Sequence, residues 1–390
     1  MEENNTNSNF FTNFELSKTA NIEETVNELF AADPVLQRQS TEFSNRLIKR
    51  YKHLKKWAKR TGVNCYRLYD KDIPEIPLAV DLYQGTPMQN ETVTGAKTPA
   101  QNAEEPEKYL HIALYQRPYQ KDQNEEENWL KAMTFAAKTS LEIPFENIFV
   151  KYRKKQRGEN AQYEKFSTQK HLICVKENDL HFKVNLSDYL DTGLFFDHRP
   201  LREQIKYECA GKDVLNLFCY TGSFSCYAAL GKAKSVDSVD LSKTYLDWNK
   251  QNFALNGFDT TQKVQNAGKT VEKYRFIQED AVNFVQSAAK ADEHKALRCR
   301  WDLIILDPPT FSNSKRLKDV FDINRDWHEL VNSCLKCLNP GGKLYFSTNS
   351  TKLKFEESLV SGTVSDITDQ TVPEDFRNRK IHRCWLIQPK

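Results

Sequence analysis

Long apolar runs are missing from this sequence of 390 residues. No stretch approaches the roughly 18 apolar residues that a membrane-spanning helix needs. The amino-terminal residues 1–5 also lack the basic and apolar regions of a signal peptide. We therefore expect a cytoplasmic protein without a membrane partner. A hydrophobic content of 39% over this length is sufficient for two ordinary domains.

Paired cysteine motifs are also scarce, although nine cysteines are present. The cysteines are scattered from Cys65 to Cys384, and without a secretory signal this pattern predicts reduced, buried thiols. The single C-x-x-C pair, Cys334 and Cys337, lies on a predicted amphipathic helix and has no second pair to complete a zinc site. We expect no bound metal.

The sequence also lacks a large excess of either positive or negative charge, since its net charge is only +3. The positive charges are nevertheless clustered, which is more informative than their sum. One cluster lies on a predicted helix at 43–60, where Phe43, Leu47 and Leu54 recur at helical spacing. A second cluster occupies residues 151–157.

The pattern of residues divides the chain into three parts. Residues 1–38 are polar and predict a flexible extension with a short helix near residues 22–30. Residues 39–188 predict a small α/β accessory domain, and residues 189–390 predict alternating strands and helices in a doubly wound, mainly parallel sheet. Strands of this sheet are expected at residues 214–218, 235–240, 274–278, 301–306, 343–347 and 382–387.

Candidate ligand-binding residues follow the ends of these strands, where such sheets bind their ligands. The first strand turns into a helix through one glycine, Gly222, and not through the repeated glycines of a dinucleotide site. Asp240 ends the second strand, where its carboxylate could accept both hydroxyls of a ribose. Asp280 follows the third strand and suits either an adenine amino group or a helix cap. Asp307 follows the fourth strand and is held by two consecutive prolines, Pro308 and Pro309.

Together these motifs resemble the RlmK family of 23S ribosomal RNA methyltransferases, which modify N7 of a guanine. The resemblance covers nearly everything from residue 43 onward. It rests on the following segments: Asn45-Arg46, residues 65–70, Asp191-Thr192-Gly193-Leu194-Phe195, Asp197-His198-Arg199, Asn216-Leu217-Phe218, Tyr220-Thr221-Gly222-Ser223, Asp240-x-Ser242, Asp307-Pro308-Pro309-Thr310-Phe311, Asn378-Arg379 and Ile381-His382.

The resemblance implies a Rossmann-like class I methyltransferase domain with a seven-stranded sheet and S-adenosylmethionine as cofactor. It also implies a free-standing counterpart of the C-terminal half of a fused enzyme. The partner would be 23S rRNA or a large-subunit assembly intermediate. The oligomeric state stays open. The residues expected to bind the cofactor are Phe195, Asp197, Arg199, Asn216, Phe218, Tyr220, Thr221, Gly222, Ser223, Asp240, Leu241, Asp280, Ala281 and Asp307.

The remaining expected site residues serve catalysis and RNA binding. For catalysis we expect Asp307, Pro308 and Phe311, with Phe311 stacking on the base and Arg199 or Lys315 holding an RNA phosphate. The residues expected to contact RNA are Arg46, Lys49, Arg50, Lys52, Lys56, Lys59, Arg60, Lys151, Arg153, Lys154, Lys315 and Arg316.

Three alternative functions remain open at this point. Methylation of cytosine C5 needs a nucleophilic cysteine, but Ser347-Thr348-Asn349-Ser350 stands where related enzymes carry it, and Cys219 and Cys226 are expected to be buried. Methylation of the exocyclic N2 amine of guanine usually places an aromatic residue after the two prolines, where this chain has Thr310. A non-catalytic RNA assembly factor is the third alternative.

Overall fold

A computed structural model describes residues 22–88, 106–119, 121–153, 170–266, 268–291, 299–312 and 321–390. Within these residues the chain forms two compact units. Of the described residues, unit 1 contains 22–88, 106–179 and 184–192, and unit 2 contains 180–183 and those from 193 to 390.

Unit 1 begins with two helices, α1 (Ile22–Ala32) and α2 (Pro34–Thr61). Asp33 starts α2 as its N-cap, because its carboxylate accepts the backbone N–H groups of the second and third residues that follow it. Val26 and Leu36 are buried in the core of the unit. The expected flexible extension is therefore wrong for residues 22–38, whose apolar side chains belong to the core. Residues 1–21 lie outside the described residues.

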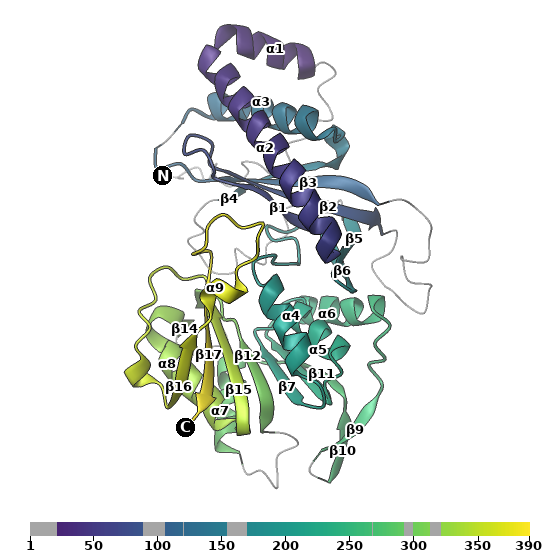
Figure 1. Ribbon diagram of the computed structural model, residues 1–390, viewed down its shortest axis with the longest axis vertical. Coiled ribbons are helices and arrows are strands. Elements are labelled where there is room, and N and C mark those ends of the chain that lie inside the picture. The colour runs from purple at the N-terminus through teal and green to yellow at the C-terminus, as the bar shows by residue number, and fades with distance from the viewer. Residues whose placement is uncertain are drawn as a thin grey trace, which may run out of the picture. The chain divides into compact units, whose positions relative to one another are not determined.

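A mixed sheet forms the other layer of unit 1. Its strands are β1 (Cys65–Asp70), β2 (Leu78–Pro87), β3 (Glu107–Tyr115), β4 (Ile148–Arg153), β5 (Leu172–Glu177) and β6 (Leu180–Asn185). The order is β4-β3-β2-β5-β6, with β1 paired to β2. Helix α3 (Gln123–Leu141) lies with α2 on one side of this sheet (Figure 1). Most of the segment between Gly85 and Lys108 lies outside the described residues, and the strands β2 and β3 that flank it are antiparallel.

Unit 2 is built on a seven-stranded sheet, as expected. Its strands are β7 (Asp213–Leu217), β8 (Ser235–Asp240), β11 (Tyr274–Gln278), β12 (Trp301–Leu306), β15 (Leu338–Thr348), β16 (Gly362–Asp366) and β17 (Arg383–Pro389). The order is β11-β8-β7-β12-β15-β17-β16. The first five strands are parallel, and β17 is antiparallel to both neighbours.

Helices cover both faces of the sheet of unit 2 (Figure 1). They are α4 (Arg199–Glu208), α5 (Ser223–Leu230), α6 (Lys243–Leu255), α7 (Ala281–Lys290), α8 (Ile323–Lys336) and the short α9 (Thr368–Thr371). Helices α7 and α8 contact each other and share one core with the apolar side chains of the sheet. The chain order and the two covered faces confirm the predicted doubly wound class.

Two smaller features complete the description of unit 2. Two short hairpins join the larger elements of unit 2, one of β9 (Lys263–Asn266) with β10 (Lys269–Glu272), the other of β13 (Phe311–Ser312) with β14 (Phe321–Asp322). Neither hairpin was predicted, and neither was α4. Among the described residues, no helix is long and apolar enough to span a membrane.

Candidate active site

The turn after β7 has an unusual backbone. Phe218, Tyr220 and Gly222 all have positive φ angles, of 55°, 51° and 78°. For the two aromatic residues this left-handed conformation is unfavourable, and such residues concentrate at functional sites. The turn therefore marks the carboxyl edge of the sheet as the candidate site.

Gly222 has a second reason to be glycine, within the protein itself. A Cβ atom at this position would lie 2.0 Å from the side chain of Asn249 on α6. The glycine thus permits close contact between the turn and α6, in addition to the cofactor approach expected from the sequence.

Asp240, at the end of β8, is the buried acid of this turn. Its Oδ2 accepts the backbone N–H of Tyr220 at 2.9 Å, and its Oδ1 accepts that of Ser242 at 2.8 Å. Burial raises the pKa of Asp240 to about 6, although these N–H groups favour the charged form. A carboxylate oxygen can accept more than one hydrogen bond, so this group could also receive hydroxyl donors.

Three aromatic rings surround the turn. The rings of Phe195 and Tyr220 lie 5.1 Å apart, and Tyr220 meets Tyr245 edge-on at 4.5 Å. Phe195 is 43% exposed, which is unusual for so large an apolar side chain. Such a surface can receive a flat heterocycle.

Other expected cofactor residues make internal contacts. Asn216 donates to Ser225 at 2.9 Å, and the hydroxyl of Thr221 donates to the carbonyl of Gly193 at 2.6 Å. Asp280 caps α7 by accepting the N–H of Asn283. These contacts order the loops of the site. Of the remaining expected positions, Ser223 and Leu241 are partly buried and Ala281 is buried.

Both carboxylate oxygens of Asp307, directly after β12, have a polar neighbour. Ser347 at the end of β15 donates its hydroxyl to Oδ1 at 2.6 Å, and Nε2 of His198 lies 3.3 Å from Oδ2. The side chain of Asp307 is still 29% exposed. Pro308 is buried behind it, and the side chain of Phe311 lies outside the described part of the chain.

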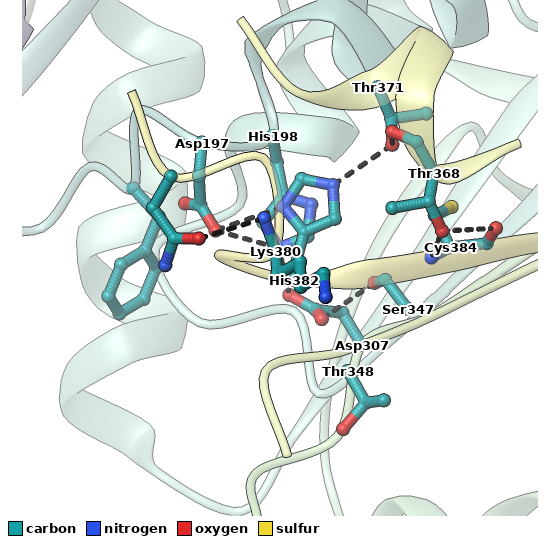
Figure 2. Close-up of polar contacts among 12 residues, drawn as sticks. Asp197, His198, Asp307, Ser347, Thr348, Thr368, Thr371, Lys380, His382 and Cys384 are labelled. Carbon is teal, nitrogen blue, oxygen red and sulfur yellow. Dashed lines mark hydrogen bonds and ion pairs between the residues drawn. The ribbon is translucent and has the colours of Figure 1, made fainter. Parts of the chain in front are cut away.

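A chain of polar contacts continues from His198 (Figure 2). Nε2 of His198 lies 3.8 Å from Oδ2 of Asp197, and Nδ1 of His382 lies 3.2 Å from the same oxygen. The two imidazole rings stack at 4.5 Å with an angle of 15° between them. Nε2 of His382 lies 2.9 Å from the hydroxyl of Thr371. Burial alone would raise the pKa of Asp197, but the two histidines hold that pKa well below its usual range.

The side chains of Asp197, His198 and His382 lie close together but do not form a convincing metal site. Their ligand atoms all lie within 4.8 Å of one another. However, the two imidazoles are nearly parallel, so their in-plane lone pairs do not converge on one point. The contact of His382 with Asp197 also uses one of these ligand atoms already.

The comparisons with known proteins identify the family of the chain. Residues 109–368, more than half of the chain, match the family described as S-adenosylmethionine-dependent methyltransferase. The chain belongs to this methyltransferase family. Its methyl donor is accordingly S-adenosylmethionine.

Individual relatives support this assignment. The ribosomal RNA large subunit methyltransferase K of Neisseria meningitidis serogroup B is 42% identical over 90% of this chain and 88% of that protein. A ribosomal RNA large subunit methyltransferase K/L of Pseudoalteromonas atlantica is 41% identical over 89% of this chain but 44% of that protein. The chain thus spans less than half of the K/L relatives. A crystal structure of a putative methyltransferase complexed with SAH shares the fold, with a TM-score of 0.61 and 22% identity, and the match covers 89% of this chain and 81% of that one.

Two of the basic residues predicted for the methyltransferase are buried, which corrects their expected roles. Arg199 is 4% exposed, and its guanidinium donates to Asp375 at 2.9 Å, so it cannot hold an RNA phosphate. Lys151 is 6% exposed, and its ammonium donates to the carbonyl of Tyr189. Both charges serve the interior of their own unit.

The basic face of α2 is largely as predicted. Leu47, Leu54 and Trp57 are buried. Five of the basic residues expected to contact RNA are exposed on this helix: Lys49, Lys52, Lys56, Lys59 and Arg60. Arg46 instead pairs with Asp72 at 2.8 Å. Arg50 is half-buried, and its guanidinium donates to the Leu68 carbonyl at 3.4 Å. The following lie outside the described atoms: the side chain of Arg153, and the whole of Lys154, Lys315 and Arg316.

Sequence reasoning missed His198, His382 and Ser347 as site residues of the methyltransferase. His198 stands between two residues that were selected, Asp197 and Arg199, and both histidines lie in segments that carry the resemblance. Only the fold brings residues 185 positions apart into contact, as it does for Asp197 and His382.

Proposed function

We propose that this methyltransferase transfers a methyl group from S-adenosylmethionine to N7 of a guanine in 23S rRNA. The observation that carries the proposal is the Asp307 carboxylate, with a polar neighbour at each oxygen and still partly exposed at the strand edge. The names of the Neisseria and Pseudoalteromonas relatives support the RNA class. The substrate is either 23S rRNA or a large-subunit assembly intermediate.

The cofactor site that we propose centres on Asp240. This buried carboxylate fits the two hydroxyls of a ribose, and the exposed ring of Phe195 fits an adenine face. Asp280 follows β11, the strand beside β8, and we expect it to accept from the adenine amino group. When bound, S-adenosylmethionine supplies an electrophilic methyl group.

Transfer to N7 fits a site that offers a fixed negative charge. The N7 lone pair forms the new bond to carbon while the carbon–sulfur bond breaks, and no proton has to leave. The positive charge moves from sulfur to the purine. Asp307 stabilises this developing charge, and the hydroxyl of Ser347 keeps the carboxylate oriented, so little reorganisation is needed during transfer.

The thiols of the site argue against methylation of cytosine C5, which needs a thiolate. Burial raises the pKa of the Cys219 and Cys226 thiols well above the ordinary value, and it does the same for Cys384. Ser347 occupies the end of β15 and bonds Asp307. The amine reaction remains the second candidate, because Asp307 could equally orient an NH2 group.

RNA binding is assigned to the exposed basic face of α2. Its lysines Lys49, Lys52, Lys56 and Lys59 are solvent-exposed along one helix whose apolar side is buried. This arrangement offers phosphate contacts without sequence specificity.

The test is to map the product. Purified protein would be incubated with S-adenosylmethionine and 23S rRNA from a strain that lacks the corresponding enzyme, and the nucleosides would be analysed by mass spectrometry. N7-methylguanine weakens the glycosidic bond, so borohydride and aniline should cut the RNA at the modified position. A methylated guanine that resists this cleavage would indicate the amine reaction. The absence of any methyl transfer would favour a binding role.

A further inference from the structure

Asp307 lies at the end of a contact chain that the reaction proposed above does not use directly. The chain runs from Thr371 through His382, Asp197 and His198 to Asp307 (Figure 2). Its members come from separate segments of unit 2, and His198 and His382 are 7% and 0% exposed at their side chains. A buried polar chain of this kind is costly unless its members satisfy one another.

The orientation of His198 follows from its neighbours. Carboxylate oxygens of Asp197 and Asp307 lie 3.8 and 3.3 Å from Nε2, which favours the tautomer with the proton on that nitrogen. Nδ1 is buried without a hydrogen-bond partner among the described residues, as suits a nitrogen that carries no proton. The ring plane is fixed by stacking on His382.

We propose that His198 is a positioning residue for methyl transfer, whose Nε2–H holds the Asp307 carboxylate toward the methyl acceptor. Asp197 and His382 act one step further away, because they fix the imidazole of His198. This inference rests on the proposed function, which gives Asp307 its electrostatic role. A carboxylate held by a donor at each oxygen cannot turn away as positive charge develops on the base.

The test compares His198→Leu, which removes the donor, with His198→Gln, whose amide N–H can replace it. We expect His198→Leu to lower the single-turnover transfer rate roughly 10- to 100-fold, as for other groups that orient a catalytic side chain. The KM for RNA and the affinity for S-adenosylhomocysteine should stay within about twofold, since His198 acts on the chemical step. His198→Gln should recover most of the rate. His328→Gln, on α8, serves as the matched control and should match the wild type.

A double-mutant cycle separates this role from a structural one. If His198 acts through Asp307, the variant with both His198→Leu and Asp307→Asn should be no slower than Asp307→Asn alone. Fully additive losses would overturn the proposal, as would an unchanged rate in folded His198→Leu. Product mapping tests the proposed function separately from this cycle. The double-mutant cycle gives the same answer whichever atom of the base receives the methyl group.

A measurement that needs no methyl transfer tests the proposal even if the variant does not fold or the RNA is not methylated. In protein labelled with ¹⁵N-histidine, NMR should show His198 protonated at Nε2 and not at Nδ1. Asp307→Asn should shift the Nε2–H resonance of His198 and leave that of His328 in place. A wild-type His198 protonated at Nδ1 would refute the proposal, even if the His198→Leu variant did not fold or the RNA received no methyl group.

Discussion

Replacing Asp240 by asparagine should separate the binding of the cofactor from the folding of the protein. Asparagine preserves the size of the side chain but keeps only one of the two oxygens, each of which already accepts a backbone N–H. Loss of one charge-assisted contact to a ribose hydroxyl costs about 1.5–3 kcal/mol. The dissociation constant for S-adenosylhomocysteine should therefore rise roughly 10- to 150-fold.

The pH dependence gives an independent check of the same contact. Because burial raises the pKa of Asp240 to about 6, the free protein takes up a proton there in mildly acidic solution. The charged form binds the hydroxyl donors, so affinity is complete above pH 7 and is lost as the pH falls through 6. At pH 5 about nine-tenths of the free protein is protonated at this site, so the affinity should be about tenfold weaker. The asparagine variant should show no such step.

Isothermal titration calorimetry with S-adenosylhomocysteine between pH 5 and 8 measures both effects. Asp259→Asn is the control, since Asp259 is exposed and, among the described residues, its carboxylate accepts only from Thr261 in its own turn. An Asp240→Asn variant that is folded and binds within twofold of the wild type would remove Asp240 from the cofactor site. A flat wild-type profile across this range would refute the electrostatic reasoning.

Three further predictions concern other parts of the chain. Replacing Cys219 and Cys226 together by alanine should leave the transfer rate within about threefold, because burial keeps both thiols protonated; a covalent RNA adduct in the wild type would contradict this. Gly222→Ala should cost about 1–3 kcal/mol more than Gly257→Ala in denaturant unfolding, since both have positive φ but only the first would clash; equal costs would count against the contact with Asn249. Charge reversal to glutamate at three exposed α2 lysines should weaken RNA binding and reduce its salt slope by roughly three. These are Lys52, Lys56 and Lys59. The same reversal at exposed lysines of unit 2 is the control: Lys250, Lys290 and Lys336. Equal effects of the two triple variants would assign the α2 charges to solubility.

The parallel sheet was predictable because its signals are local. The strands Ser235–Asp240, Tyr274–Gln278 and Trp301–Leu306 have the predicted bounds. Strand β12 is an apolar run that is buried on both faces of the sheet. An acidic residue ends β8, and acidic residues come directly after β11 and β12. These acidic residues at the strand ends allowed the carboxyl edge of the sheet to be predicted as the site.

Helix α4 and Lys151 show where local reasoning failed. Helix α4 is strongly polar, and two of its buried residues are arginines, Arg199 and Arg202. With so few apolar residues, its sequence resembles that of a loop. Lys151 was grouped with neighbouring charges, but side chains alternate between the faces of a strand, and that of Lys151 points to a carbonyl of the interior. Runs of like charge therefore indicate a surface only after the secondary structure is known.

The polar chain behind Asp307 could not be predicted from spacing at all. Arg199 and Asp375, which brace the start of α4, are 176 residues apart. The contact between His382 and Asp197 spans 185 residues. Such pairs depend on the antiparallel last strand returning beside β15, a feature of topology and not of any one segment.

Two acids at comparable places in the sheet acquire different chemistry from their surroundings. Asp240 and Asp307 follow β8 and β12, the strands on either side of β7. Asp240 is buried and held by backbone N–H groups, so its charge is available for neutral hydroxyl donors and is sensitive to mild acid. Asp307 is more exposed and meets an imidazole and a hydroxyl, so in the proposed reaction it faces a charge that appears only during transfer. In the reaction that we propose, the fold supplies the positions, and the groups around each carboxylate decide that Asp240 binds the cofactor and Asp307 stabilises the reacting base.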